Sequence, residues 1–123
     1  MEKILKRHHI SFKNAITGIL WAFTTQPNFI IHIVLSLFAI LLGWFVSLTT
    51  WEWILLVFTI IWGLSAEMIN TAIEAMTDLI TSEWKQEAKI AKDVSAGMML
   101  LTACGAVVIA VILFLPKLIF RFL

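Results

Sequence analysis

The sequence predicts an all-α integral membrane protein with three transmembrane helices and an amphipathic surface helix at its N-terminus. Hydrophobic residues make up 61% of the 123 residues and charged residues only 14%, which is far more apolar than a soluble domain of this length. Three stretches of about twenty mostly apolar residues are each long enough to cross a bilayer. The length fits one domain over residues 1–123.

Residues 1–26 form the predicted surface helix. Apolar side chains recur at helical spacing between residues 4 and 23, and basic side chains fall largely on the opposite side. A helix with one apolar face and one basic face lies along a membrane surface. Pro27 is well placed near the start of the next helix.

The three predicted membrane helices differ in polarity. Residues 29–48 contain His32 as their only ionisable side chain, and residues 96–115 contain no charged side chain. Residues 53–80 are apolar in the first half and polar in the second. The middle helix is therefore the one expected to carry functional residues.

Basic residues are distributed unevenly along the chain. Seven of the nine Lys and Arg residues lie before residue 14 or between residues 85 and 92, and the turn at 49–52 has none. Because cytoplasmic loops carry an excess of Lys and Arg, we expect the N-terminus and the 81–94 segment in the cytoplasm and the C-terminus outside. Lys117 and Arg121 count weakly against this orientation.

The polar half of the middle helix, AEMINTAIEAMTDLI at 66–80, carries a narrow acidic stripe. At roughly 100° per residue, Glu67, Asn70, Glu74 and Asp78 fall within about 80° of one another. Ionisable residues inside a span are costly and mark functional sites. Carboxylates and an amide a turn or two apart suit Mg²⁺, or a base beside a metal. The plain alternative is that the helix simply leaves the membrane here.

Lys92 and Asp93 follow on the cytoplasmic side of the third span. A lysine beside acids that can hold Mg²⁺ suggests phosphate handling, because substrate phosphates usually complete the Mg²⁺ ligand shell. The familiar glycine-rich nucleotide-binding motifs are missing from the sequence. A zinc site at His32 is not expected, since no second His or Cys stands at ligand spacing.

The motif EMINTAIEAMTD at 67–78, followed by AKD at 91–93, resembles the signature of the prokaryotic diacylglycerol kinase family, E-x-[LIVM]-N-[ST]-[SA]-[LIV]-E-x-x-V-D. Thr77 stands in place of the valine, and the similarity runs from Arg7 to LFLPKL near the C-terminus. The resemblance implies a multi-pass homotrimer of the bacterial cytoplasmic membrane with active sites shared between subunits. It also implies transfer of the γ-phosphate of ATP, with Mg²⁺, to the hydroxyl of a membrane lipid, and no nucleic-acid partner.

The resemblance assigns roles residue by residue. Glu67 resembles the catalytic base and Glu74 a Mg²⁺ ligand. The positions that resemble nucleotide-binding residues are Arg7, Asn70, Asp78, Glu83, Lys92 and Asp93, with Asn70 orienting the site. The expected depths of these residues in the membrane agree with their roles. A base for a lipid hydroxyl must lie deeper in the membrane than a site for a metal and a triphosphate.

Gln26 is where the chain departs from the family. Members usually carry a second acidic metal ligand before the first span, in a pattern like E-x-N-x-R-x-H, whereas this chain has Gln26, Asn28, Ile30 and His32. We assign Gln26 as a metal ligand through its amide oxygen. We expect weaker metal and nucleotide binding, because one negative charge is missing.

The lipid substrate is an alcohol of one of two kinds. His32 and the LFLPKL ending look more like the members from Gram-positive bacteria, which phosphorylate undecaprenol. We therefore expect undecaprenol, with a diacylglycerol kinase that makes phosphatidic acid as the alternative. A small carboxylate-dependent membrane transporter and a catalytically silent membrane protein are the other readings. The transporter explains neither the surface helix nor Lys92 and Asp93.

Overall fold

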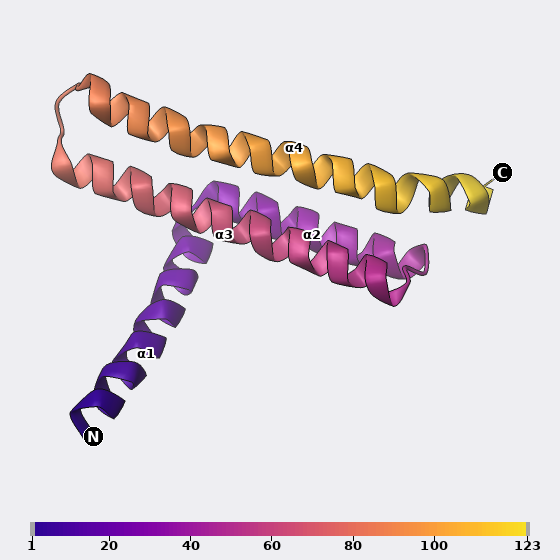
Figure 1. Cartoon of the computed structure of the whole chain (residues 1–123), viewed down its shortest axis with the longest axis horizontal. Coiled ribbons are helices and arrows are strands. Elements are labelled where there is room, and N and C mark those ends of the chain that lie inside the picture. Colours follow the sequence, from indigo (N-terminus) through magenta and orange to yellow (C-terminus); the bar gives the residue numbers. More distant parts are fainter. Residues whose placement is uncertain (1, 123) are drawn as a thin grey trace.

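The computed structural model describes the backbone of residues 2–122 and the side chains of residues 11–122. Over these residues the chain forms four α-helices, α1 (Glu2–Thr25), α2 (Pro27–Phe45), α3 (Thr50–Ile80) and α4 (Gln86–Phe122). Figure 1 shows α2, α3 and α4 side by side as a bundle, while α1 leaves the bundle at a large angle. α2, α3 and α4 are each long and apolar enough to cross a membrane. The all-helical fold with three candidate spans is confirmed.

The large apolar side chains of the bundle point mostly outward. Phe38, Leu41 and Leu101 are 63%, 68% and 76% exposed. In water such a surface would drive aggregation, whereas in a bilayer it faces the lipid chains. The exposed apolar surface and the three long helices together describe a multi-pass membrane protein.

α2 ends earlier than the hydropathy of residues 29–48 predicts. The amide of Val46 donates to the Leu42 carbonyl at 2.9 Å, and that of Leu48 donates to the Gly43 carbonyl at 3.1 Å. Between them Ser47 adopts a left-handed backbone with φ of 56°. These bonds close the helix end and turn the chain towards α3.

α3 and α4 extend beyond the predicted spans of residues 53–80 and 96–115. With 31 and 37 residues, they rise roughly 45 and 55 Å at 1.5 Å per residue, against a hydrocarbon core of about 30 Å. α4 begins ten residues early, at Gln86, where Lys89 and Asp93 form an ion pair four residues apart. It also continues through Pro116, because a proline in a membrane helix costs one backbone bond without ending the helix.

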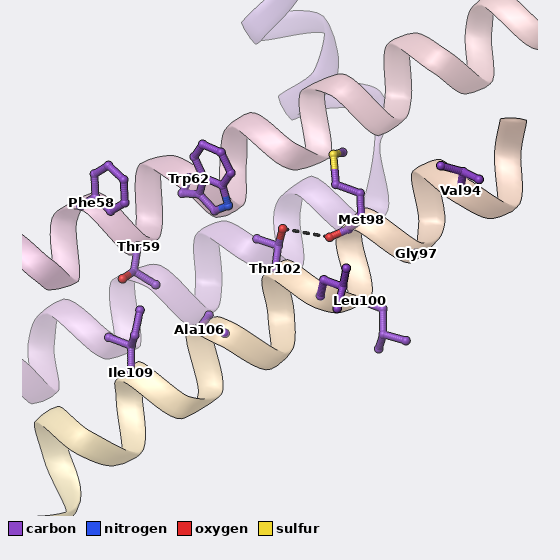
Figure 2. Close-up of a pocket in the computed structure, with 12 residues that line it drawn as sticks. Phe58, Thr59, Trp62, Val94, Gly97, Met98, Leu100, Thr102, Ala106 and Ile109 are labelled. Atoms are coloured by element: carbon purple, nitrogen blue, oxygen red, sulfur yellow. Dashed lines mark hydrogen bonds between the residues drawn. The ribbon is translucent and has the colours of Figure 1, made fainter.

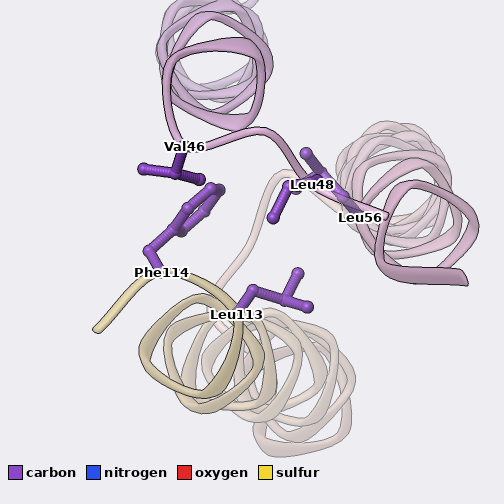
Figure 3. Packing of buried hydrophobic residues seen from close by; sticks show 5 residues of the cluster. All are labelled: Val46, Leu48, Leu56, Leu113 and Phe114. Atoms are coloured by element: carbon purple, nitrogen blue, oxygen red, sulfur yellow. The ribbon is translucent and has the colours of Figure 1, made fainter. Parts of the chain in front are cut away.

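A compact apolar cluster ties the α2–α3 turn to α4. Figure 3 shows its buried members, which are Val46, Leu48, Leu56, Leu113 and Phe114. Each is less than one-tenth exposed. This cluster fixes the end of the bundle that lies opposite the acidic stripe.

Polar contacts reinforce the same end. One carboxylate oxygen of Glu52 accepts hydrogen bonds from the amide and hydroxyl of Thr49 at 2.7 and 2.9 Å, and it lies 3.0 Å from Lys117 Nζ. Arg121 donates to the Phe45 carbonyl at 2.9 Å and stacks 4.3 Å above the Phe45 ring centroid. The two cations that count against the expected orientation therefore have structural partners here.

Candidate functional site

A recess between α2 and α4, with α3 at its base, holds most of the predicted acidic stripe. Its volume is about 350 Å³. Glu67, Asn70 and Glu74 line it from α3. The rest of the lining is Asn28, Ile31 and His32 from α2, and Ala96, Met99, Leu100 and Ala103 from α4. This is called the Glu67 recess below.

Glu67 is the most buried acid among the described side chains. Its residue surface is 3% exposed, and no described side chain forms a hydrogen bond or ion pair with its carboxylate. Removing a carboxylate from water costs several kcal/mol unless a partner compensates. A buried acid without a structural partner, facing a recess, is typical of a functional site. The burial disfavours the alternative that the helix merely leaves the membrane at this point.

Asn70 connects the recess to Glu74. Its Nδ2 donates to Glu74 Oε1 at 3.0 Å. The residue is 6% exposed, and its Oδ1 has no hydrogen-bond partner among the described residues. An unpaired buried carbonyl oxygen costs about 1–3 kcal/mol. The Asn70–Glu74 pair therefore combines an oriented carboxylate with a buried amide oxygen that no described residue bonds.

These oxygens fit a hard cation that keeps few protein ligands. The described residues contain no cluster of three or more His, Cys, Asp and Glu side chains able to hold a metal, which is the arrangement that zinc sites require. Mg²⁺ prefers oxygen, and one or two carboxylates with water and phosphate oxygens complete its shell. Glu74 and Asn70 Oδ1 are suitable protein ligands of that kind.

The predicted phosphate-handling residues lie in two ion pairs near the loop between α3 and α4. Lys92 of α4 pairs with Asp78 of α3, and Lys89 pairs with Asp93 along α4. All four side chains are at least 41% exposed. Exposed pairs contribute little to stability. Lys92 and both acids can therefore exchange their present partners for a ligand at small cost.

Gln26 and Glu83, two further predicted site residues, do not line the recess. Gln26 precedes α2, is half-buried, and its Nε2 donates to Thr25 Oγ1 at 3.3 Å. Glu83 is exposed in the loop between α3 and α4, where its amide donates to Thr81 Oγ1 at 3.1 Å. The side chain of Arg7 lies outside the described side chains. For these three residues the predicted ligand roles stay predictions.

Asn28 and His32 were not predicted to be site residues, yet both line the recess. They occur four residues apart at the start of α2, so they share one helix face. That spacing is a readable signal in the sequence. The sequence does not show the packing register, which places this face of α2 against the polar half of α3.

A larger groove between α3 and α4 carries no such chemistry. Its volume is about 860 Å³, and none of its lining residues is ionisable (Figure 2). Phe58 and Trp62 contribute aromatic walls, and the Thr102 hydroxyl is already bonded to the Met98 carbonyl at 2.9 Å. The groove is an apolar surface, suited to lipid chains or to another helix.

Comparison with known proteins agrees with the geometry of the recess. Residues 13–114 match the family described as prokaryotic diacylglycerol kinase. Undecaprenol kinase of Bacillus subtilis is 38% identical over 115 residues, which cover 93% of each chain. Diacylglycerol kinase of Synechocystis is 37% identical over 110 residues, which cover 89% of this chain and 63% of that protein.

The family match covers every residue that lines the Glu67 recess, together with Lys92 and Asp93. Both relatives are named as kinases of lipid alcohols, and the similarity extends over most of this chain. The chain therefore belongs to the prokaryotic diacylglycerol kinase family, which comprises membrane lipid kinases.

Proposed function

We propose that this chain transfers the γ-phosphate of ATP, in the presence of Mg²⁺, to the hydroxyl of a membrane lipid alcohol. The observation that carries the proposal is the buried, unpaired carboxylate of Glu67 beside the Asn70–Glu74 hydrogen bond in one recess. A base and a candidate metal ligand on the same helix face are what such a transfer needs.

Glu67 is the proposed general base. Its carboxylate accepts the proton of the lipid hydroxyl while the hydroxyl oxygen bonds to the γ-phosphorus and the bond to the departing ADP oxygen breaks. Ile31 and Leu100 line the same recess. Their apolar side chains reduce the access of water, which would otherwise compete with the lipid as the acceptor.

Glu74 and Asn70 Oδ1 are the proposed protein ligands of Mg²⁺, and Gln26 is a further one. When bound, the cation neutralises charge on the phosphates. The Asn70 amide holds the Glu74 carboxylate in place. Nucleotide contacts are proposed for Lys92, Asp78, Asp93, Glu83 and Arg7.

Undecaprenol is the proposed lipid, with diacylglycerol as the alternative. The relative named undecaprenol kinase is matched along 93% of its own length, whereas the one named diacylglycerol kinase is matched along 63%. The sequence features that favour undecaprenol are His32 and the LFLPKL ending. The apolar α4 wall of the recess suits either lipid, because each has a single free hydroxyl and long hydrocarbon chains.

A homotrimer in the bacterial cytoplasmic membrane is the proposed assembly. The large apolar groove supports it, since Thr102 and Ala106 in its lining are small enough for close helix approach. Ala110, one helical turn beyond Ala106, packs instead against the apolar cluster at the α2–α3 turn. Light scattering of the purified protein in detergent should give the mass of three chains. A monomer that retains full turnover would contradict the trimer.

A kinase assay in mixed micelles tests the function. Purified protein is supplied with radiolabelled ATP, Mg²⁺ and either undecaprenol or diacylglycerol, and the labelled lipid is counted. Glu67→Gln should lower turnover about 100-fold or more, since a general base typically contributes 10²–10⁴, while equilibrium ATP binding is retained.

Glu87→Gln is the matched control, because Glu87 is an exposed acid in the first turn of α4. It should keep wild-type turnover. Loss of ATP affinity in Glu67→Gln without loss of turnover would remove Glu67 from the base role. Absence of phosphorylated product with both lipids would refute the proposed reaction.

A further inference from the structure

His32 is the only ionisable residue of α2, and neither the base nor the metal ligands account for it. Its side chain is half-buried and lines the Glu67 recess. Neither ring nitrogen forms a hydrogen bond with another described residue, although the His32 backbone carbonyl accepts one from Ser36 at 2.7 Å. A polar ring inside a membrane helix without a partner points to a ligand.

The position of the ring relative to Glu67 follows from α3. His32 Nδ1 lies 3.9 Å from the place that a Cβ would occupy at Gly63. Gly63 precedes Glu67 by one helical turn, or about 6 Å along the axis. The imidazole therefore packs beside Gly63, at ordinary van der Waals distance, on the membrane side of the base. Asn70 and Glu74 lie on the other, cytoplasmic side.

An alcohol bound at Glu67 would need a hydrogen-bond donor near the position of the His32 ring. A hydroxyl has one hydrogen to donate and lone pairs to accept with. If its hydrogen goes to Glu67, its oxygen still needs a donor. The α4 residues of the recess have none in their side chains, Asn70 Nδ2 already donates to Glu74 at 3.0 Å, and Asn28 is exposed in the first turn of α2. An oxygen left without a donor in such surroundings costs about 1–3 kcal/mol.

We propose that His32 binds the lipid alcohol, with an imidazole N–H donating a hydrogen bond to the hydroxyl oxygen while that hydroxyl donates to Glu67. The proposal rests on the proposed function and names the lipid side of the same site. The hydroxyl is then held from two helices, by His32 of α2 and Glu67 of α3. His32 sets where the oxygen stands, and Glu67 takes the proton.

Kinetics of His32→Leu separate this role from a packing role. The KM for undecaprenol should rise about tenfold or more, the fold-change expected when a buried hydroxyl loses its donor. The KM for ATP and the Mg²⁺ requirement should stay within about twofold. His32→Gln, which keeps an N–H donor, should recover part of the lipid affinity. Ser36→Ala, one turn further along α2 and outside the recess, should match wild type.

A binding measurement keeps the test independent of turnover. In ¹⁵N-labelled protein without ATP, the imidazole signal that disappears in His32→Leu should move on addition of undecaprenol. It should not move with squalene, an isoprenoid hydrocarbon without a hydroxyl. If undecaprenol leaves that signal unmoved, or if His32→Leu changes the ATP or Mg²⁺ requirement more than the lipid KM, the proposal is overturned.

The two proposals fail in different ways. Wild-type protein without kinase activity on either lipid refutes the proposed function, and the imidazole signal still decides whether His32 binds an alcohol. Active wild-type protein whose lipid KM is equal to that of His32→Leu refutes only the role of His32.

Discussion

Replacing Asn70 by alanine should raise the Mg²⁺ concentration needed for half-maximal activity. The substitution removes the 3.0 Å hydrogen bond to Glu74 Oε1 and the unpaired Oδ1. A hydrogen bond to a charged group contributes about 1.5–3 kcal/mol. Because Glu74 is exposed, we discount this to about 1–2 kcal/mol, which corresponds to a rise of about 5- to 30-fold in the Mg²⁺ midpoint.

The assay is a Mg²⁺ titration of lipid phosphorylation at saturating ATP and lipid. Thr71→Ala is the matched control, since Thr71 is the buried neighbour of Asn70 and does not line the recess. It should leave the midpoint unchanged. Equal midpoints in wild type and Asn70→Ala would refute the reasoning, because Asn70 would then neither orient Glu74 nor lie near the cation.

Three further substitutions test other parts of the structure. Gln26→Glu should lower the Mg²⁺ and ATP concentrations needed for half-maximal activity about tenfold or more, because a carboxylate binds the cation more tightly than an amide by about 1.5–3 kcal/mol. The KM for the lipid should stay unchanged. Unchanged Mg²⁺ and ATP midpoints would place residue 26 away from the metal. Gly43→Val should lower the thermal unfolding temperature, since a Cβ at Gly43 would already lie 3.0 Å from both Leu48 Cδ1 and Trp53 Cη2. Crowding of this kind costs about 1–3 kcal/mol. An unchanged unfolding temperature would mean that these two side chains move aside freely. Ser47→Gly should raise the same temperature by relieving the left-handed φ of 56°, a conformation that costs other residues about 1–2 kcal/mol; a lower temperature would contradict that strain.

Helical periodicity predicted the site on α3 because everything it needed was local. Glu67, Asn70 and Glu74 share a face through helix geometry alone, and all three line the recess. Asp78 belongs to the same stripe in projection, yet it pairs with Lys92 of α4 instead. That pairing depends on how the α3–α4 loop folds back, which periodicity does not report.

Hydropathy located the spans but not the helix ends. Hydropathy measures where a segment suits lipid, whereas α4 begins ten residues before the predicted span, with a first part that carries charged side chains. The end of α2 depends on hydrogen bonds around Ser47 that no hydropathy window contains. His32 was missed as a lining residue of the recess for a different reason: its place depends on the packing of α2 against α3, which sets its ring near Gly63, 31 positions away in the sequence.

The unbroken course of α3 from Thr50 to Ile80 has a consequence for how this enzyme can diverge. Glu67 and Glu74 are seven residues apart on one continuous helix, which sets them about 10 Å apart along its axis. Inserting or deleting a single residue between them would turn one carboxylate by roughly 100° relative to the other and shift it by about 1.5 Å. The spacing of the two carboxylates therefore depends on the length of this segment, whereas substitutions at other positions leave that spacing unchanged.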